Sequence, residues 1–183
     1  FLQDVAATRI RFSTMMGDEF TPIECDGRLV GQAMTNILKN AVESVTSRLE
    51  QDDASGTVDP EGGFVEVEMN QDGEKTVISV EDNGLGLPQD HKDRLMEPYV
   101  TTRAKGTGLG LAIVRRIMEE HGGTVRIADR HPQGARVILS FSHSALRKKA
   151  KKAQTEKENE SRAAEELRDT VKRNGESPAN AAE

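Results

Sequence analysis

Large apolar side chains are almost confined to the first 143 of the 183 residues, and this distribution decides which part of the chain can fold. Residues 144–183 hold ten Lys and Arg, eight Asp and Glu, and only three large apolar residues, Leu146, Leu167 and Val171. Such a segment buries too little apolar surface to fix its own structure, although Ala, Glu, Lys and Arg favour transient helix. We therefore predict one globular domain over residues 1–143 and a charged, disordered tail over residues 144–183.

Charge and composition exclude several classes of protein. The net charge of the chain is −6, and its acidic first 143 residues argue against a nucleic-acid-binding surface. No run of about 18 apolar residues is present and no signal peptide is recognisable behind Phe1, so neither membrane contact nor secretion is expected. Cys25 is the only cysteine, which leaves no internal disulfide and favours a reducing compartment. These features predict a cytoplasmic domain.

Hydrophobic spacing predicts two main helices. Apolar residues recur at three- and four-residue steps over residues 27–49 and again over residues 109–121, which is the pattern of a helix with one buried face. Gly122 and Gly123 end the second helix, and His121 before them is predicted to cap it.

Short runs of alternating or apolar residues predict five strands. They cover residues 9–16, 64–69, 76–80, 124–128 and 135–141. Asp72-Gly73 is a hairpin-turn signal between the second and third strands, and a short helix is predicted over residues 89–96. This order predicts an α+β fold, a two-layer sandwich in which helices cover one face of a mixed, mostly antiparallel sheet.

Two polar motifs lie on otherwise apolar elements. Asn36 and Asn40 are one helical turn apart and Glu43 follows three residues later, so all three project from one helix face. Asn is a mediocre helix former, so its repetition indicates a ligand, although a solvated polar face explains it too. Asp82 ends the third strand, and two glycines follow within residues 83–86. These glycines either let the backbone approach a flat ligand closely or form an ordinary turn between a strand and a helix.

A glycine-rich segment opens the second helix. Residues 106–111 are Gly-Thr-Gly-Leu-Gly-Leu, and the free amides and positive dipole end of a helix start suit phosphate oxygens. The segment is not a Walker A loop, because no Gly-Lys-Ser/Thr occurs, nor a Rossmann fingerprint, because position 111 is Leu. The preceding residues 97–105 carry Arg103 and Lys105, so they form either a loop that closes over a nucleotide or an ordinary solvated loop.

In this order and at these separations, the four motifs resemble four boxes of the catalytic ATP-binding domain of sensor histidine kinases. These are the N box (36–44), G1 box (82–88), F box (96–102) and G2 box (106–111). The resemblance covers about residues 26–141 and implies the Bergerat fold shared with the gyrase, Hsp90 and MutL ATPases of the GHKL superfamily. The strings EPYVTTR and KGTGLGLAIV are most similar to nitrogen-regulation sensor kinases of the NtrY type.

The resemblance implies a role in binding Mg²⁺ and ATP or ADP for each matching residue. Asn40 corresponds to the Mg²⁺ ligand, and Asn36 and Lys39 to residues beside the phosphates; with Arg103 of the ATP lid they are the catalytic candidates. Asp82 corresponds to the carboxylate that accepts a hydrogen bond from the adenine amino group. The other implied nucleotide-binding positions are Gly84 and Gly86, which make room for the base, and Tyr99, Thr102, Lys105, Gly106, Thr107, Gly108, Leu109, Gly110 and Leu111. Gly134 occupies the place of the last and least specific glycine box.

Departures from the family pattern refine these expectations. Members that hydrolyse ATP efficiently carry a Glu four residues before the Mg²⁺-binding Asn, but here Asn36 occupies this position and cannot act as a base. A kinase is therefore favoured over an ATPase. Glu43 stands where many sensor kinases have Lys, which puts the phosphate contact expected there in question, and Met96 and Tyr99 replace the usual phenylalanines of the F box.

The phosphoacceptor motif of sensor kinases, a His followed by an acidic residue, does not occur. The residues that follow His91, His121, His131 and His143 are Lys, Gly, Pro and Ser. We therefore expect a monomeric catalytic piece of a longer two-component kinase, itself a homodimer anchored in the bacterial inner membrane. The expected partners are the parent's dimerisation domain, which bears the phosphoacceptor, and the receiver domain of a response regulator. An anti-sigma-type serine/threonine kinase and a non-catalytic, nucleotide-responsive interaction module remain alternatives on the same fold.

Overall fold

The computed structural model describes residues 9–17, 22–57, 61–101, 106–148, 150–152, 154–156, 158–159 and 162. The chain forms two compact units, residues 1–146 and residues 147–183. The first unit ends at Leu146 rather than at residue 143, because the Leu146 side chain is buried in its core. In the second unit the described residues are helical, and the disorder of the tail remains a prediction. Within the described ranges, no helix has both the length and the hydropathy needed to cross a membrane.

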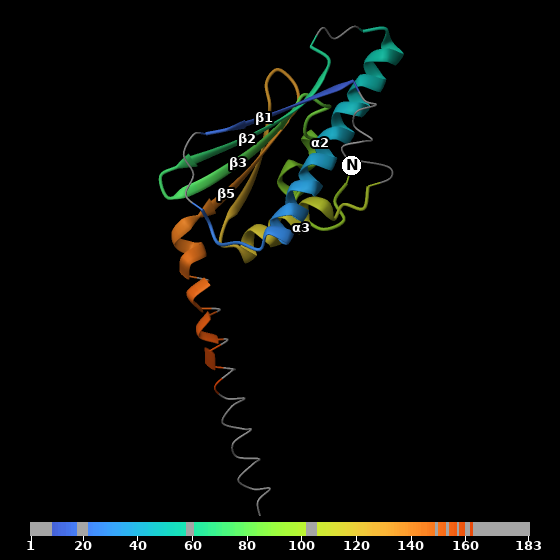
Figure 1. The fold of residues 1–183 in the computed structure, drawn as a ribbon. Coiled ribbons are helices and arrows are strands. Elements are labelled where there is room, and N and C mark those ends of the chain that lie inside the picture. Colours follow the sequence, from blue (N-terminus) through green and yellow to red (C-terminus); the bar gives the residue numbers. More distant parts are fainter. Residues whose placement is uncertain are drawn as a thin grey trace, which may run out of the picture. The chain divides into compact units, whose positions relative to one another are not determined.

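A five-stranded sheet forms one layer of the first unit, with the strand order β1-β2-β3-β5-β4 (Figure 1). The strands are β1 (Ile10–Met16), β2 (Gly63–Asp72), β3 (Lys75–Asp82), β4 (Thr124–Asp129) and β5 (Ala135–Ser142). β1 runs parallel to β2, and the other neighbouring pairs are antiparallel. The mixed, mostly antiparallel sheet is therefore confirmed.

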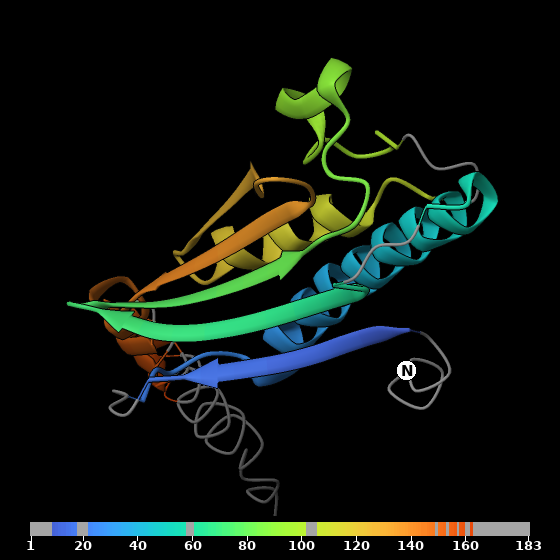
Figure 2. The ribbon, with the colours of Figure 1, turned by 90° about the horizontal axis from the view of Figure 1, so that it is seen from above.

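Two helices, α2 (Gly27–Ser55) and α3 (Gly110–Glu120), cover one face of this sheet (Figures 1 and 2). Their buried faces follow the three- and four-residue spacing of the sequence, and they pack on alternate residues of the strands. The buried apolar core contains Ile10, Ala33, Ile37, Ala41, Val45, Val65, Val80, Val114, Ile117, Met118, Leu139, Phe141 and Leu146. The predicted two-layer sandwich is confirmed, and the predicted short helix is the 3₁₀-helix η1 (Gln89–Arg94).

The long helix α2 continues beyond the predicted end at residue 49. Arg48 is buried, and its guanidinium bonds to the Asp52 carboxylate at 2.8 Å and to the Gly62 carbonyl at 2.9 Å. The ion pair spans one helical turn and supports helix where apolar spacing has ended. Gly56, with φ of +72°, then closes the helix in the left-handed conformation.

Asp26 begins α2 as its N-cap. Its carboxylate accepts hydrogen bonds from the amides of Arg28 at 2.9 Å and Leu29 at 3.1 Å. The bond from the Leu29 amide is the main cause that holds the pKa of the Asp26 carboxyl below its ordinary value. The start of α2 is therefore fixed by a local interaction, in which the Asp26 side chain caps the amides of the first turn.

Gly31 offers a direct test of the helical interior of α2. It is exposed, and a Cβ added there would have no heavy atom within 4 Å. Because Ala loses less backbone entropy than Gly on entering a helix, Gly31→Ala is expected to raise the free energy of unfolding by about 0.5–1 kcal/mol. Thermal unfolding followed by circular dichroism measures this gain. Gly27→Ala, at the helix start, is expected to gain less, and a lowered midpoint for Gly31→Ala would contradict the assignment.

Candidate functional site

The start of α3 lies beside the middle of α2. A Cβ added to Gly110 would lie 3.7 Å from Asn40 Nδ2 and 4.0 Å from Asn36 Cβ. The structure thus brings together the asparagine motif and the glycine-rich segment, which are far apart in the sequence. Both contribute polar groups without net charge, namely side-chain amides from α2 and backbone amides from α3.

Asn36 and Lys39 differ in how their polar groups are satisfied. Asn36 Nδ2 is buried and has no hydrogen-bond partner among the described residues. A buried donor left unpaired costs about 1–3 kcal/mol, so this atom favours a ligand that accepts a hydrogen bond beside α3. Lys39 is largely exposed, and its Nζ lies 3.9 Å from Glu43 Oε1 one turn along the helix.

The start of α3 has no side-chain cap. Leu109 occupies the N-cap position and its side chain caps no amide of the following turn, while its own amide donates to Thr107 Oγ1 at 3.4 Å. Gly106 and Thr107 are exposed, whereas Gly110 and the neighbouring leucines at 109 and 111 are half-buried. Helix-start amides without a capping oxygen, at the positive end of the dipole, suit an anion.

Tyr99 connects the F-box segment to the same helix start. Its amide donates to the Gly108 carbonyl at 3.0 Å, and a Cβ on Gly108 would lie 2.6 Å from the Tyr99 carbonyl carbon. Tyr99 itself has a φ of +66° and is 79% exposed. Thr102, Arg103 and Lys105 lie outside the described residues, so their roles remain predictions.

Asp82 marks the other end of the site, where β3 stops. Its carboxyl is buried, with 5% of the residue exposed, and Oδ1 accepts from the Gly84 amide at 2.9 Å. The next amide, of Leu85, donates to Ser44 Oγ on α2 at 3.0 Å. A Cβ on Gly84 would lie 2.3 Å from Ser44 Oγ, so close packing on α2 requires this glycine independently of any ligand.

The β4–β5 hairpin closes over the end of β3 through Gly134. This residue has a φ of +119°, and a Cβ there would lie 1.8 Å from the Asp82 carbonyl oxygen. Gly86, with a φ of +80°, faces Gly134, because its Cβ would lie 3.3 Å from the Gly134 carbonyl oxygen. The strand end that carries Asp82 is therefore enclosed by two glycines.

Sequence reasoning missed two residues that hold this region together. Ser44 bonds to the loop after β3, and its only sequence signal is its position one turn beyond Asn40. Asn83 is buried, accepts from the Phe64 amide at 2.8 Å and donates to the Gly62 carbonyl at 2.8 Å. This side chain extends the β2–β3 pairing beyond Asp82 and fixes the end of β3.

The arrangement suits an elongated ligand with two different ends. A buried carboxylate accepts hydrogen bonds at Asp82, whereas amide donors gather around Gly110; on α2, Ser44 and Asn40 lie one turn, about 6 Å, apart. No group of three or more His, Cys, Asp or Glu side chains in the described part of the chain is placed to hold a metal. A divalent cation here would take the Asn40 amide oxygen together with oxygens of the ligand, a donor set that suits Mg²⁺.

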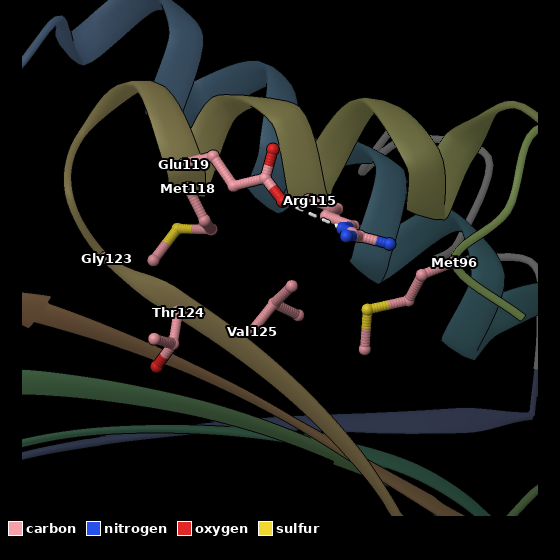
Figure 3. Close-up of a pocket in the computed structure, with 7 residues that line it drawn as sticks. All are labelled: Met96, Arg115, Met118, Glu119, Gly123, Thr124 and Val125. Atoms are coloured by element: carbon pink, nitrogen blue, oxygen red, sulfur yellow. Dashed lines mark hydrogen bonds and ion pairs between the residues drawn. The ribbon is translucent and has the colours of Figure 1, made fainter. Parts of the chain in front are cut away.

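A hollow of about 310 Å³ lies elsewhere, between α3 and β4 (Figure 3). Its lining residues are Met96, Arg115, Met118, Glu119, Gly123, Thr124 and Val125. Arg115 and Glu119 form an ion pair at its edge, drawn as a dashed line in Figure 3. Neither Asp82 nor Asn40 nor Gly110 lines this hollow, so it is distinct from the place where the motifs meet.

Residues 25–145 match the family described as Histidine kinase-, DNA gyrase B-, and HSP90-like ATPase. The chain is 53% identical over 113 residues to the nitrogen regulation protein NtrY of Azorhizobium caulinodans, which covers 62% of this chain and 14% of NtrY. It is 32% identical over 146 residues to the sensor histidine kinase ZraS of Escherichia coli O157:H7, which covers 80% of this chain and 29% of ZraS. The chain thus spans less than a third of the length of these relatives.

The chain is similar to solved structures of histidine kinase ThkA. The nucleotide-free catalytic domain of histidine kinase ThkA superposes with a TM-score of 0.63 at 26% identity, covering 78% of this chain and 85% of that one. Histidine kinase ThkA in complex with the response regulator protein TrrA gives a TM-score of 0.60 at 25% identity, covering 79% of this chain and 37% of that one. These similarities agree with the observed sandwich.

Proposed function

This chain belongs to the histidine kinase-, DNA gyrase B- and HSP90-like ATPases, and from that membership we propose that it is the catalytic ATP-binding part of a two-component sensor histidine kinase of the nitrogen-regulation type. It binds Mg·ATP and presents the γ-phosphate to a histidine on the dimerisation domain of its parent, from where the phosphoryl group passes to a response regulator. The proposal is carried by one observation, the meeting of Asn36 and Asn40 with the start of α3 at Gly110.

Each end of the site has its own task in this proposal. Asp82 accepts a hydrogen bond from the adenine amino group, and the amides at the start of α3 hold phosphate oxygens. Asn36 Nδ2 donates to a phosphate oxygen, which satisfies its otherwise unpaired hydrogen atoms. Asn40 would supply an amide oxygen to Mg²⁺, which when bound would neutralise phosphate charge. Phosphoryl transfer needs chiefly positioning and such neutralisation.

The site favours transfer over hydrolysis. An amide such as Asn36 cannot remove a proton from water, and Glu43, one turn from Lys39, has its Oε1 3.9 Å from the Lys39 ammonium. Without a base at position 36 to activate water, the phosphoryl group remains available to a histidine. This supports a kinase rather than an ATPase.

Mg²⁺ dependence tests the role of Asn40. Mg·ADP at about a hundredfold excess over its dissociation constant is expected to stabilise the wild-type fold by about 2.7 kcal/mol, and EDTA is expected to reduce this gain. Asn40→Ala should remove most of the difference between Mg²⁺ and EDTA, as measured by thermal unfolding and calorimetry. Asn70→Ala, on the exposed part of β2, is the matched control. Equal ADP affinity with Mg²⁺ and EDTA in both wild type and Asn40→Ala would refute the metal role.

Phosphorylation in trans tests the proposed function itself. The full chain is incubated with γ-labelled ATP and the separately produced dimerisation domain of its parent kinase. Acid-labile phosphohistidine on that domain is the expected product. Acid-stable phosphoserine would instead establish the serine/threonine kinase, and nucleotide binding without any transfer would establish the interaction module.

The parent kinase has an expected cellular location and oligomeric state. We infer that the parent is a homodimer in the bacterial inner membrane and that this chain acts on its cytoplasmic side as a monomer. The solved complex of ThkA with the response regulator TrrA supports a receiver-domain partner. Sedimentation of the isolated chain should give the mass of one copy.

A further inference from the structure

His121 joins the end of α3 to the start of α2. The residue is buried, with 6% of its surface exposed. Its Nδ1 lies 2.7 Å from the Ile117 carbonyl oxygen, and the Asp26 amide donates to its Nε2 at 3.1 Å. Because Nε2 accepts, the neutral ring carries its hydrogen on Nδ1 and donates it to Ile117.

Both partners of the ring are terminal groups of helices. The Ile117 carbonyl lies in the last turn of α3, where it also accepts from the backbone amide of His121 at 3.1 Å. Asp26 is the N-cap of α2, so the His121 ring bonds to the backbone at the residue where that helix begins. Phe141 of β5 packs edge-on against the imidazole, with ring centroids 6.5 Å apart and an interplanar angle of 85°. The ring is thus held by both helices and by the sheet.

The same two helices meet again at the nucleotide site. Gly110, at the start of α3, lies beside Asn36 and Asn40, whereas the end of α3 lies beside the start of α2, so the helices are antiparallel. From Asp26 to Asn36 along α2, and from His121 to Gly110 along α3, the distance is about 15 Å. If each helix moves as one body over this length, a shift at the His121 contact would move Asn36 and Asn40 against the α3 amides.

We propose that His121 is a positioning residue for nucleotide binding. Its Nε2 bond to the Asp26 amide sets the register between α2 and α3, and this register aligns the side chains of Asn36 and Asn40 with the helix-start amides that receive phosphate. Asp82 itself lies on β3, although the loop after it is tied to α2 by the bond from the Leu85 amide to Ser44 Oγ, so His121 acts more strongly on the phosphate end of the site than on the base end. The inference rests on the function proposed above.

Two variants separate the bonds of the ring. In His121→Asn the side-chain amide can replace the Nδ1 donor to Ile117, but it is too short to reach the Asp26 amide. In His121→Gln the longer side chain places an oxygen near the position of Nε2 and keeps the acceptor for Asp26. Affinities for Mg·ADP and for adenosine are measured on the full chain by calorimetry and NMR titration at a temperature where every variant is folded.

The expected result is a split between the two ligands. His121→Asn should weaken Mg·ADP binding about fivefold or more while adenosine binding changes less than twofold, and His121→Gln should stay near wild type. A purely structural role would change neither affinity of the folded protein, or both equally. Either outcome, or equal losses of ADP affinity in both variants, overturns the proposal.

Asp26 provides a second test if the His121 variants do not fold. Asp26→Ala and Asp26→Pro both remove the capping carboxylate, but only proline also removes the backbone donor, and the φ of −75° at this position is compatible with proline. The proline variant should lose at least fivefold more ADP affinity than the alanine variant, and equal affinities overturn the proposal. Wild-type chain that binds neither ADP nor adenosine would instead refute the proposed function.

Discussion

Replacing Asp82 with Ala is expected to lower the affinity for Mg·ADP by about ten- to a hundredfold. The proposed interaction is a charge-assisted hydrogen bond from the adenine amino group, which contributes about 1.5–3 kcal/mol, and every 1.4 kcal/mol or so is a factor of ten. The carboxyl is buried at the end of β3, so its partner is not replaced easily by water. Isothermal titration calorimetry measures the loss.

Asp82 also accepts a bond from the Gly84 amide, so its removal affects the loop as well as the ligand. Inosine diphosphate separates the two effects, because its base carries a carbonyl oxygen in place of the adenine amino group. Wild type should prefer ADP over inosine diphosphate, and Asp82→Ala should lose this preference. Asp53→Ala, at the exposed Arg9–Asp53 ion pair, should leave both affinities unchanged. Unchanged ADP affinity in Asp82→Ala would falsify the assignment of the base site.

Replacing Gly134 with Ala has the largest expected effect on stability. Its Cβ would lie 1.8 Å from the Asp82 carbonyl oxygen, 2.8 Å from the Asp82 carbonyl carbon and 2.9 Å from Asn83 Cα. All three neighbours are backbone atoms, which cannot rotate away as a side chain can, and the φ of +119° is unfavourable for Ala. The hairpin must withdraw from β3, so a loss of at least about 2 kcal/mol is expected.

This loss should appear as a fall of about 5–10 °C in the unfolding midpoint, together with weaker ADP binding. Gly73→Ala is the matched control, because Gly73 has a φ of +57° in the β2–β3 turn but its Cβ would meet no heavy atom within 4 Å. It should cost only about 1 kcal/mol for the backbone conformation and leave ADP affinity intact. Equal losses in the two variants would show that the close approach to Asp82 is unimportant.

Local sequence pattern predicts one end of a helix well when a clear stop signal is present. The predicted helix over residues 109–121 and the observed α3, Gly110–Glu120, agree closely because a strong three- to four-residue repeat ends at two glycines. The predicted end of α2 at residue 49 is wrong, because Arg48 continues the helix by pairing with Asp52 and by bonding to the Gly62 carbonyl. The second of these contacts joins segments that only the folded chain brings together.

In the candidate site, too, some features follow from the sequence and others depend on tertiary contacts. Helical spacing alone places Asn36 and Asn40 on one face. The order of the four motifs indicates a nucleotide through their resemblance to the boxes of sensor histidine kinases. The contact of Ser44 with the loop after β3 has no comparable signal, because it depends on how closely α2 approaches the sheet. The same holds for Gly134, whose need for glycine arises from a strand distant in sequence.

By itself, therefore, the sequence determined the element types, the buried faces and the family, because these depend on residue spacing and on motifs within short segments. The tertiary structure decided the parallel pairing of β1 with β2, the enclosure of Asp82 by Gly86 and Gly134, and the bond from Asp26 to His121. Each of these is a contact between segments far apart in the chain. Its geometry follows from the packing of whole helices and strands, which no local pattern specifies.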